Sequence, residues 1–168
     1  MTPMSRPPVL LAATPGSATC LPWGDRVQEI VASGLTAGAF ASFSVDASPS
    51  TRRPAYVDHA ADEAFLVLSG SVTVDVSGRV FTDLGPGAAV YVPRGALRSF
   101  RTGRDGARLL LTQTPGADLD GVRELFPSPV DGPAEVASAQ LAAALRRCGI
   151  ELVPFPADTP HAPEEILT

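Results

Sequence analysis

The chain has 168 residues, of which 45% are hydrophobic and 18% charged, and its formal net charge is -5. This length suffices for one compact domain and is short for two. No basic stripe is visible, which argues against a nucleic-acid partner, and no run approaches the about 20 apolar residues of a membrane span. The N-terminal apolar run is too short for a secretory signal, so we expect a cytoplasmic protein in which Cys20 and Cys148 are free thiols.

Short strands separated by turns dominate the first two thirds of the chain. Seventeen Pro and fifteen Gly interrupt it, and the pieces between them alternate apolar and polar residues, as in SVTVDVSG at 71–78. The predicted strands cover residues 26–33, 39–47, 63–70, 71–78, 79–87, 88–95, 97–103 and 107–116. Eight strands at regular spacing predict an antiparallel barrel or sandwich.

The pattern becomes helical after residue 116. Residues 119–125 predict a short helix, and 138–149 predict a longer one with Ser138 as its cap, followed by an edge strand at 150–155. We therefore divide the chain into an N-terminal arm (1–21), a β-barrel (22–116), a C-terminal helical appendage with its edge strand (117–155) and a flexible tail (156–168).

Two motifs give the chain a resemblance to a known family. Glu63 and Gly70, with six residues between them, resemble the second half of the first cupin motif, and Gly87 with residues 93–95 resembles the opening of the second. Over residues 22–126 the chain is similar to the small quercetin-dioxygenase-like cupins of bacteria. The resemblance implies an all-β jelly-roll barrel, the double-stranded β-helix, with a short C-terminal α-helical appendage. It also implies a homodimer.

The resemblance also implies where metal ligands would stand. Metal-binding cupins carry three His and one Glu; here Glu63 is kept, and Arg98 stands at the third His position. A four-residue spacer before Glu63 requires no gap and places Tyr56 and Asp58 at the first two positions. A three-residue spacer would place Val57 and His59 there. We favour the alignment without a gap.

This set of residues predicts that no metal is bound. Arg98 is permanently cationic and would repel a divalent ion, and a chain with two histidines, one of them in the tail, cannot form a three-His site. We therefore expect no cofactor. A divalent transition metal held by Glu63, Asp58, His59 and water remains the alternative.

Strand alternation indicates which side chains face the barrel interior. Glu63, Phe65 and Val67 share one face of their strand, and Arg98 and Phe100 share a face of theirs. Glu63 and Arg98 would then meet, either as a buried ion pair that replaces the metal or as a proton-transfer group beside an anion anchor. As candidate substrate-binding residues we take Arg98, Phe65, Phe100 and Val67.

The candidate catalytic residues surround this pair. His59, the barrel's only histidine, would be a natural general acid or base if it pointed inward, whereas the alignment without a gap turns Tyr56 and Asp58 inward. We take Glu63, His59, Asp58 and Tyr56 as the candidates. Arg52 and Arg53 are expected on a solvated loop rather than as guides for an acidic substrate.

The favoured function is that of a metal-independent cupin enzyme. It would catalyse acid/base chemistry, such as cyclisation, isomerisation or dehydration, on a small anionic or enolisable molecule in a bacterial secondary-metabolite pathway. One alternative is a metal-dependent, quercetinase-like dioxygenase. The other is a cupin that binds a small molecule without turnover.

Overall fold

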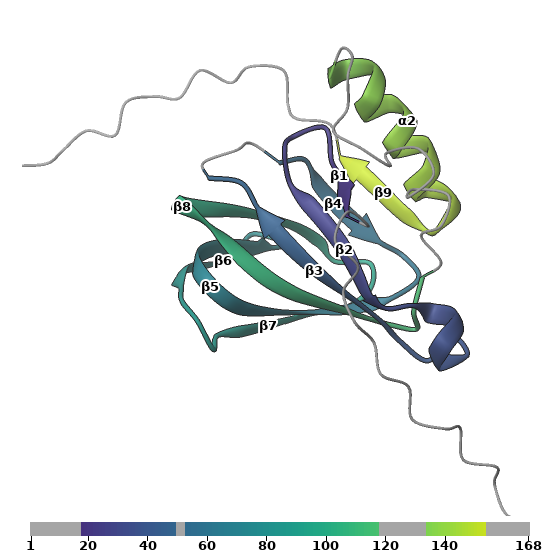
Figure 1. Cartoon of the computed structure of the whole chain (residues 1–168), viewed down its shortest axis with the longest axis horizontal. Coiled ribbons are helices and arrows are strands. Elements are labelled where there is room, and N and C mark those ends of the chain that lie inside the picture. Colours follow the sequence, from purple (N-terminus) through teal and green to yellow (C-terminus); the bar gives the residue numbers. More distant parts are fainter. Residues whose placement is uncertain (1–17, 50–52, 118–133, 154–168) are drawn as a thin grey trace, which may run out of the picture.

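The computed structural model describes residues 18–49, 53–117 and 134–153. Its elements are β1 (Thr19–Cys20), β2 (Arg26–Val31), the 3-10 helix η1 (Ser33–Thr36), β3 (Ala41–Ala47), β4 (Ala55–Asp58), β5 (Asp62–Val76), β6 (Arg79–Leu84), β7 (Ala89–Val92), β8 (Leu97–Thr114), α2 (Ala134–Arg147) and β9 (Ile150–Val153). The strands form one curled, antiparallel sheet, and α2 packs beside β9 (Figure 1). The prediction of a mainly β fold with a short C-terminal helix is confirmed.

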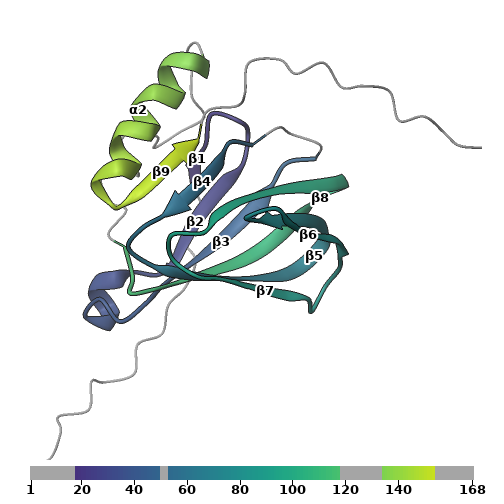
Figure 2. The same cartoon turned by 180° about the vertical axis from the view of Figure 1, so that it is seen from behind.

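Two long strands, β5 and β8, build the curled sheet. They pair from Asp62 opposite Thr114 to Val76 opposite Arg98, with register shifts near the middle of β5. Each strand therefore bends and belongs to both halves of the sheet. One half has the strand order β1-β2-β3-β8-β5-β7, and the other has the order β9-β4-β8-β5-β6. Figure 2 shows β9 and α2 on one side of the curl and β6 on the other.

Glycine at the bend explains why the sequence predicted each long strand as two. Gly70 has a φ of +74°, and a Cβ there would collide with the backbone oxygen of Gly106 on β8. Only glycine permits this close approach, and the pairing continues on both sides of it. β1 and β4, of two and four residues, were not predicted.

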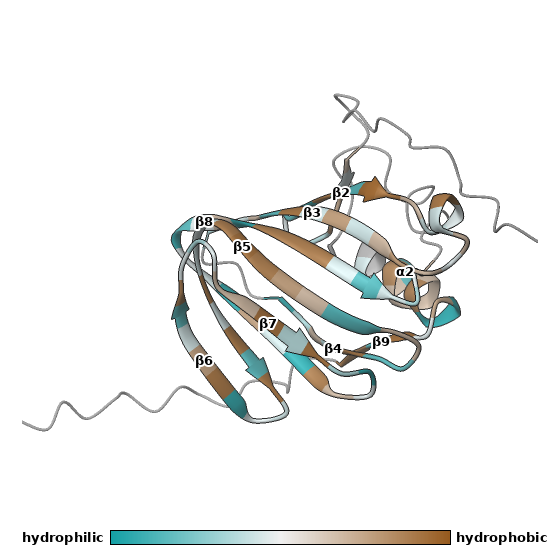
Figure 3. Cartoon of the chain, turned by 90° about the horizontal axis from the view of Figure 1, so that it is seen from below, coloured by the Kyte–Doolittle hydropathy of each residue, from teal (hydrophilic) through white to brown (hydrophobic). Residues whose placement is uncertain are grey.

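Inward-facing side chains fill the space between the two halves. The buried cluster contains Val45, Ala47, Phe65, Val67, Val72, Val74, Val90, Val92, Ala107 and Leu109. Apolar residues recur along β5 and β8 in Figure 3, as expected for strands with one buried face. Phe65 and Val67 are 4% and 3% exposed, so their predicted inward direction is confirmed.

The helix α2 covers one side of the curl. Its buried Leu141 and Ala144 pack with Leu21, Trp23, Leu145 and Leu152. The helix begins at Ala134, so Ser138 lies inside it and is not its cap, and Gly149 follows its end with a φ of +84°. After this turn β9 pairs with β4, which confirms the predicted edge strand over residues 150–153.

Several predictions lie outside the described residues. These are the helix over 119–125, the tail over 156–168 and most of the N-terminal arm. Cys20 and Cys148 are not joined by a disulfide. Within the described ranges, no helix has the length and apolar character to cross a membrane.

Candidate functional site

Glu63 is the centre of a buried polar cluster. Its Oε2 accepts hydrogen bonds from Arg98 Nη1 at 2.5 Å and from the Tyr56 hydroxyl at 3.0 Å. Its Oε1 accepts one from Gln113 Nε2 at 2.9 Å. Strand register produces this convergence, because Tyr56 on β4 lies opposite Arg98, and Glu63 on β5 lies opposite Gln113.

Asp58 joins the cluster through Gln113. The Asp58 side chain is 0% exposed, and its Oδ2 accepts a hydrogen bond from Gln113 Nε2 at 3.1 Å. Its Oδ1 accepts the backbone N–H groups of Ala60 and Ala61, each at 2.8 Å, which fixes the turn after β4. Gln113 thus bridges two carboxylates. Its amide nitrogen must face them, because its oxygen would be repelled.

His59 points away from the cluster. Its side chain is 57% exposed, and Nε2 lies 3.2 Å from the Glu151 carboxylate on β9. Tyr56 and Asp58 turn inward instead, so strand parity supports the alignment without a gap. The inclusion of His59 among the catalytic candidates is corrected accordingly.

The Arg98 guanidinium is bound to the Glu63 carboxylate. Its side chain is 1% exposed, its Nε donates to the Ala96 backbone oxygen at 3.3 Å, and its guanidinium lies 5.2 Å from the centre of the Tyr56 ring. Its Nη2 has no hydrogen-bond partner in the described part of the chain. The pair is a buried, charge-assisted contact that would be costly to break from either side.

The cluster carries more negative than positive charge, since Asp58 and Glu63 share one guanidinium. Burial raises the pKa of the Glu63 carboxyl above its ordinary value of 4.5, against the lowering effect of Arg98, Gln113 and Tyr56. Burial and then the charge of Glu63 raise the pKa of Tyr56 well above 10.0. Tyr56 is therefore a neutral phenol near neutral pH.

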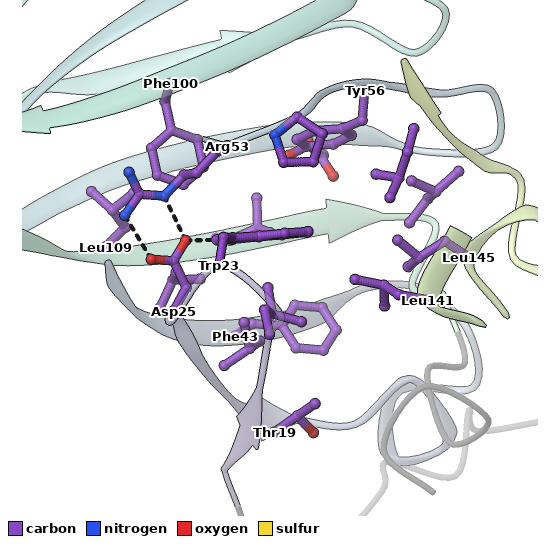
Figure 4. A pocket seen from close by; sticks show the side chains of 18 of the residues that line it. Thr19, Trp23, Asp25, Phe43, Arg53, Tyr56, Phe100, Leu109, Leu141 and Leu145 are labelled. Atoms are coloured by element: carbon purple, nitrogen blue, oxygen red, sulfur yellow. Dashed lines mark hydrogen bonds and ion pairs between the residues drawn. The ribbon is translucent and has the colours of Figure 1, made fainter. Parts of the chain in front are cut away.

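A cavity of about 160 Å³ lies between this cluster and the helix α2 (Figure 4). From the barrel, Tyr56, Glu63, Phe65, Phe100 and Gln113 contribute to its wall. From the other side come Trp23 and the α2 residues Leu141 and Leu145.

Besides His59, three candidates do not line this cavity, namely Asp58, Val67 and Arg98. The expected role of Arg98 as an anchor for a substrate anion is not supported by this placement, because its guanidinium is engaged by Glu63. Val67 belongs to the core cluster and has no cavity surface to offer a substrate. Glu63, Tyr56, Phe65 and Phe100 are brought together as the sequence suggested.

A second buried ion pair was missed by the sequence analysis. Arg53 donates to Asp25 through Nε at 2.5 Å and Nη2 at 2.6 Å, and the Trp23 indole donates to Asp25 at 2.9 Å. Arg53 is 6% exposed and lies 4.9 Å from the centre of the Phe100 ring, so the expectation of a solvated loop residue was wrong. Figure 4 shows these contacts at the cavity wall.

The signals for the missed residues differ. Gln113 continues the inward alternation of Leu109 and Leu111 on β8 and could have been found by parity. Asp25 and Arg53 lie outside strands and 28 residues apart, so no local pattern indicates their pairing.

The residues at the cupin ligand positions do not fit a divalent metal. Arg98 occupies the third His position and binds the Glu63 carboxylate that a metal would need. Tyr56 stands at another position as a phenol whose raised pKa keeps its proton. No group of three His, Cys, Asp or Glu side chains within reach of one ion occurs among the described residues.

Residues 43–112 match the model of the cupin domain family, and the curled antiparallel sheet has the fold of solved cupin structures. Among solved structures, the Streptomyces nucleoside dehydratase Pac13 is 12% identical with a TM-score of 0.53, over 64% of this chain and 84% of that one. At this identity the likeness shows the fold alone.

Two further structures share shorter segments with the chain. The cupin domain of Schizosaccharomyces pombe Cnp3 is 21% identical with a TM-score of 0.49. The polyketide cyclase RemF from Streptomyces resistomycificus is 25% identical with a TM-score of 0.47. Each match covers 54% of this chain and 64% of the other chain, which is less than two thirds of its length. No curated protein gives a significant match.

Proposed function

We propose that this cupin is a metal-independent enzyme in which Glu63 moves a proton on a small organic molecule bound in the cavity. One observation carries the proposal: a buried carboxylate, held by three side-chain donors, forms part of the wall of a largely apolar cavity. Cyclisation, isomerisation and dehydration all require a proton to be taken from one atom and delivered to another.

The environment of Glu63 suits this work. A general acid or base works best when its pKa lies near the operating pH, and burial shifts the pKa of Glu63 in that direction. Its Oε1 has one hydrogen bond and Oε2 has two, so Oε1 is the oxygen with room to exchange a proton with a substrate.

Arg98 and Tyr56 have supporting roles in this proposal. Arg98 does not line the cavity, so it acts through Glu63 as a positioning residue that fixes the carboxylate and balances its charge. The Tyr56 hydroxyl holds Oε2 at 3.0 Å. Both contacts reduce the rotational freedom of Glu63, which favours a fixed geometry for proton transfer.

Binding without turnover is the alternative, and the number of contacts that hold Glu63 favours it. A carboxylate that accepts three hydrogen bonds, one of them within an ion pair, would also serve as purely structural support. Pac13 is named a nucleoside dehydratase, but its likeness supports the fold and not the substrate.

Exchange of carbon-bound protons in heavy water separates these functions. Neutral α-hydroxyketones, such as hydroxyacetone and α-hydroxyacetophenone, would be incubated with the protein in deuterium oxide and followed by NMR. We expect catalysed deuterium incorporation that Glu63→Gln reduces about 100-fold or more. The exposed carboxylate of Asp46 gives the matched control, and Asp46→Asn should keep the activity. Ligands that bind without any exchange would favour the alternative.

The proposal extends to the protein's setting. The motifs around Glu63 and Gly87 resemble those of quercetin-dioxygenase-like cupins, which supports a tailoring step in a bacterial secondary-metabolite pathway, carried out in the cytoplasm. Leu68 and Tyr91, 45% and 65% exposed, lie on the neighbouring strands β5 and β7 and support a homodimer. Light scattering coupled to size-exclusion chromatography would measure the oligomeric state.

A further inference from the structure

Gln113 lines the cavity and carries a buried hydrogen-bond acceptor that nothing in the described part of the chain uses. Gln113 is 2% exposed, and its Nε2 donates to both Asp58 and Glu63. Its Oε1 has no hydrogen-bond partner there. A carboxylate has about four acceptor sites, of which Glu63 uses three. The neighbouring Gln113 and Glu63 therefore both have acceptor capacity to spare.

The donors around the same cavity are already engaged. The Tyr56 hydroxyl donates to Glu63, the Trp23 indole donates to Asp25, and Arg53 donates to Asp25 and to the Ser48 backbone oxygen. Thr19, whose hydroxyl can serve in either role, lies away from Tyr56 in Figure 4. A ligand near Glu63 therefore lies beside acceptors that can still accept a hydrogen bond, so a ligand that donates one is favoured.

The charges of the site disfavour an anion. Each buried guanidinium has a carboxylate partner, Arg53 with Asp25 and Arg98 with Glu63, and Arg98 does not line the cavity. Asp58 adds a buried carboxylate with no guanidinium of its own. A ligand carboxylate would face acceptors and excess negative charge at low dielectric, which costs free energy.

The rest of the cavity suits an apolar ring. A cavity of about 150 Å³ lined by apolar side chains holds one benzene molecule, and this one measures about 160 Å³. Phe65 and Phe100 contribute two tilted rings with centroids 6.1 Å apart, and α2 contributes Leu141 and Leu145. Such walls favour a planar, apolar body.

From these features we propose that the ligand is a neutral, ring-sized molecule with a hydroxyl donor, such as a phenol or a cyclic enol, whose O–H donates to Gln113 Oε1 or Glu63 Oε1. The inference rests on the proposed function in one respect, since the bound ligand is the molecule on which Glu63 would move a proton. With a cyclic enol, the ligand O–H bond breaks as an O–H bond forms at Glu63, and the electron pair stays on the enolate. Glu63 then returns the proton, or a deuteron from the solvent, to the enolate carbon, where a C–H bond forms as the C=O bond forms.

Calorimetric titration with three matched probes tests the ligand class. Phenol carries the donor, anisole has the same ring with the donor methylated, and benzoate replaces the donor with an anion. Near neutral pH we expect phenol to bind about tenfold or more tighter than anisole, and benzoate to bind more weakly than both. Equal affinity for phenol and anisole, strongest binding of benzoate, or no binding of any probe would each overturn the proposal.

Substitution of the acceptor locates the contact. Gln113→Met keeps the side-chain length but removes Oε1 together with the Nε2 that bridges Asp58 and Glu63. The preference for phenol over anisole should fall toward one while the affinity for anisole is retained. Asp46→Asn should keep the preference. An unchanged preference in folded Gln113→Met would show that Gln113 is not the acceptor. If that variant does not fold, Glu63→Gln is measured instead, and the preference should fall because a charged acceptor becomes neutral.

The two proposals can fail separately. Loss of the phenol preference with Glu63-dependent deuterium exchange intact would remove this inference alone. A phenol preference without any exchange would leave the ligand class in place and remove the enzymatic function.

Discussion

Arg98 Nη1 lies 2.5 Å from Glu63 Oε2, and each side chain is 1% exposed. At this position of a cupin barrel a cationic side chain takes the place of a metal ligand. The contact satisfies a buried charge, and its removal should therefore be far more costly than the loss of a surface ion pair.

The Glu63–Arg98 pair should contribute strongly to the stability of the fold. Arg98→Met leaves a buried carboxylate without its partner and should lower the free energy of unfolding by about 3–5 kcal/mol. Urea denaturation at neutral pH measures it. Arg108→Met, which breaks an exposed pair with Asp46, is the control and should cost about 1 kcal/mol or less. Equal costs for the two variants would show that the Glu63–Arg98 contact is not a strong buried pair.

The raised pKa of Glu63 predicts a pH-dependent stability. Because the folded pKa lies above the unfolded value, the contribution of Glu63 is fully present below the unfolded pKa and is lost as the pH rises through the folded pKa. The stability of the wild type relative to Glu63→Gln should therefore fall from about pH 5 toward neutral pH. Asp62, whose pKa is about 2, titrates below this window. A difference that stays constant or grows with pH would contradict the raised pKa.

The hydrogen bond from Tyr56 should affect the pKa of Glu63. Its hydrogen bond lowers the pKa of Glu63, so Tyr56→Phe should raise that pKa further and shift the acid limb of the deuterium-exchange profile to higher pH. Tyr91→Phe, on the outer face of β7, is the matched control and should leave the limb in place. A purely structural Tyr56 would change stability without moving the limb.

The Asp25–Arg53 pair predicts a spectroscopic effect. Asp25 accepts the Trp23 indole N–H, so Asp25→Leu should release the indole and leave Arg53 buried without its carboxylate. We expect a change in tryptophan fluorescence maximum together with a loss of about 3–5 kcal/mol in unfolding free energy. Trp23 is the only tryptophan of the chain, so the signal has one source. An unchanged spectrum would show that Asp25 does not position the indole.

Metal addition should have no specific effect on this protein. Elemental analysis of untagged protein purified without chelator should find substoichiometric transition metal. Zinc, manganese or iron should not raise the melting temperature, because Arg98 competes for Glu63. Near-stoichiometric metal that Glu63→Gln abolishes would refute this and revive the oxygenase alternative.

The sequence predicted the site where strand alternation applies. On β5 it placed Glu63 and Phe65 on one inward face, and on β8 it placed Arg98 with Phe100. Alternate side chains of a strand point to the same face, so assuming a barrel is enough to say which side chains point inward. On β4 the same rule could not choose between Asp58 and His59 until the register with β8 was known.

The rest of the site depends on contacts between distant segments. Arg53 becomes a buried partner of Asp25 only when the loop before β4 meets the turn before β2. The closure of the cavity by α2 likewise follows from packing with Leu21 and Trp23, which no local pattern specifies. Helix propensity predicted that α2 exists, but it could not predict which part of the sheet α2 covers.

The packing of α2 over the cavity has a consequence for how this barrel can diversify. The cupin match covers residues 43–112, whereas Trp23, Leu141 and Leu145 lie outside it. The shared barrel thus supplies the wall of the cavity that contains Glu63, and the flanking segments supply the opposite wall. Replacing the flanking segments would change the side chains that line the cavity opposite Glu63, so proteins with superimposable barrels can differ in what their cavities bind. Grafting experiments should therefore exchange residues 18–24 and 134–149 together, and keep Asp25 as the partner of Arg53 and β9 as the partner of β4.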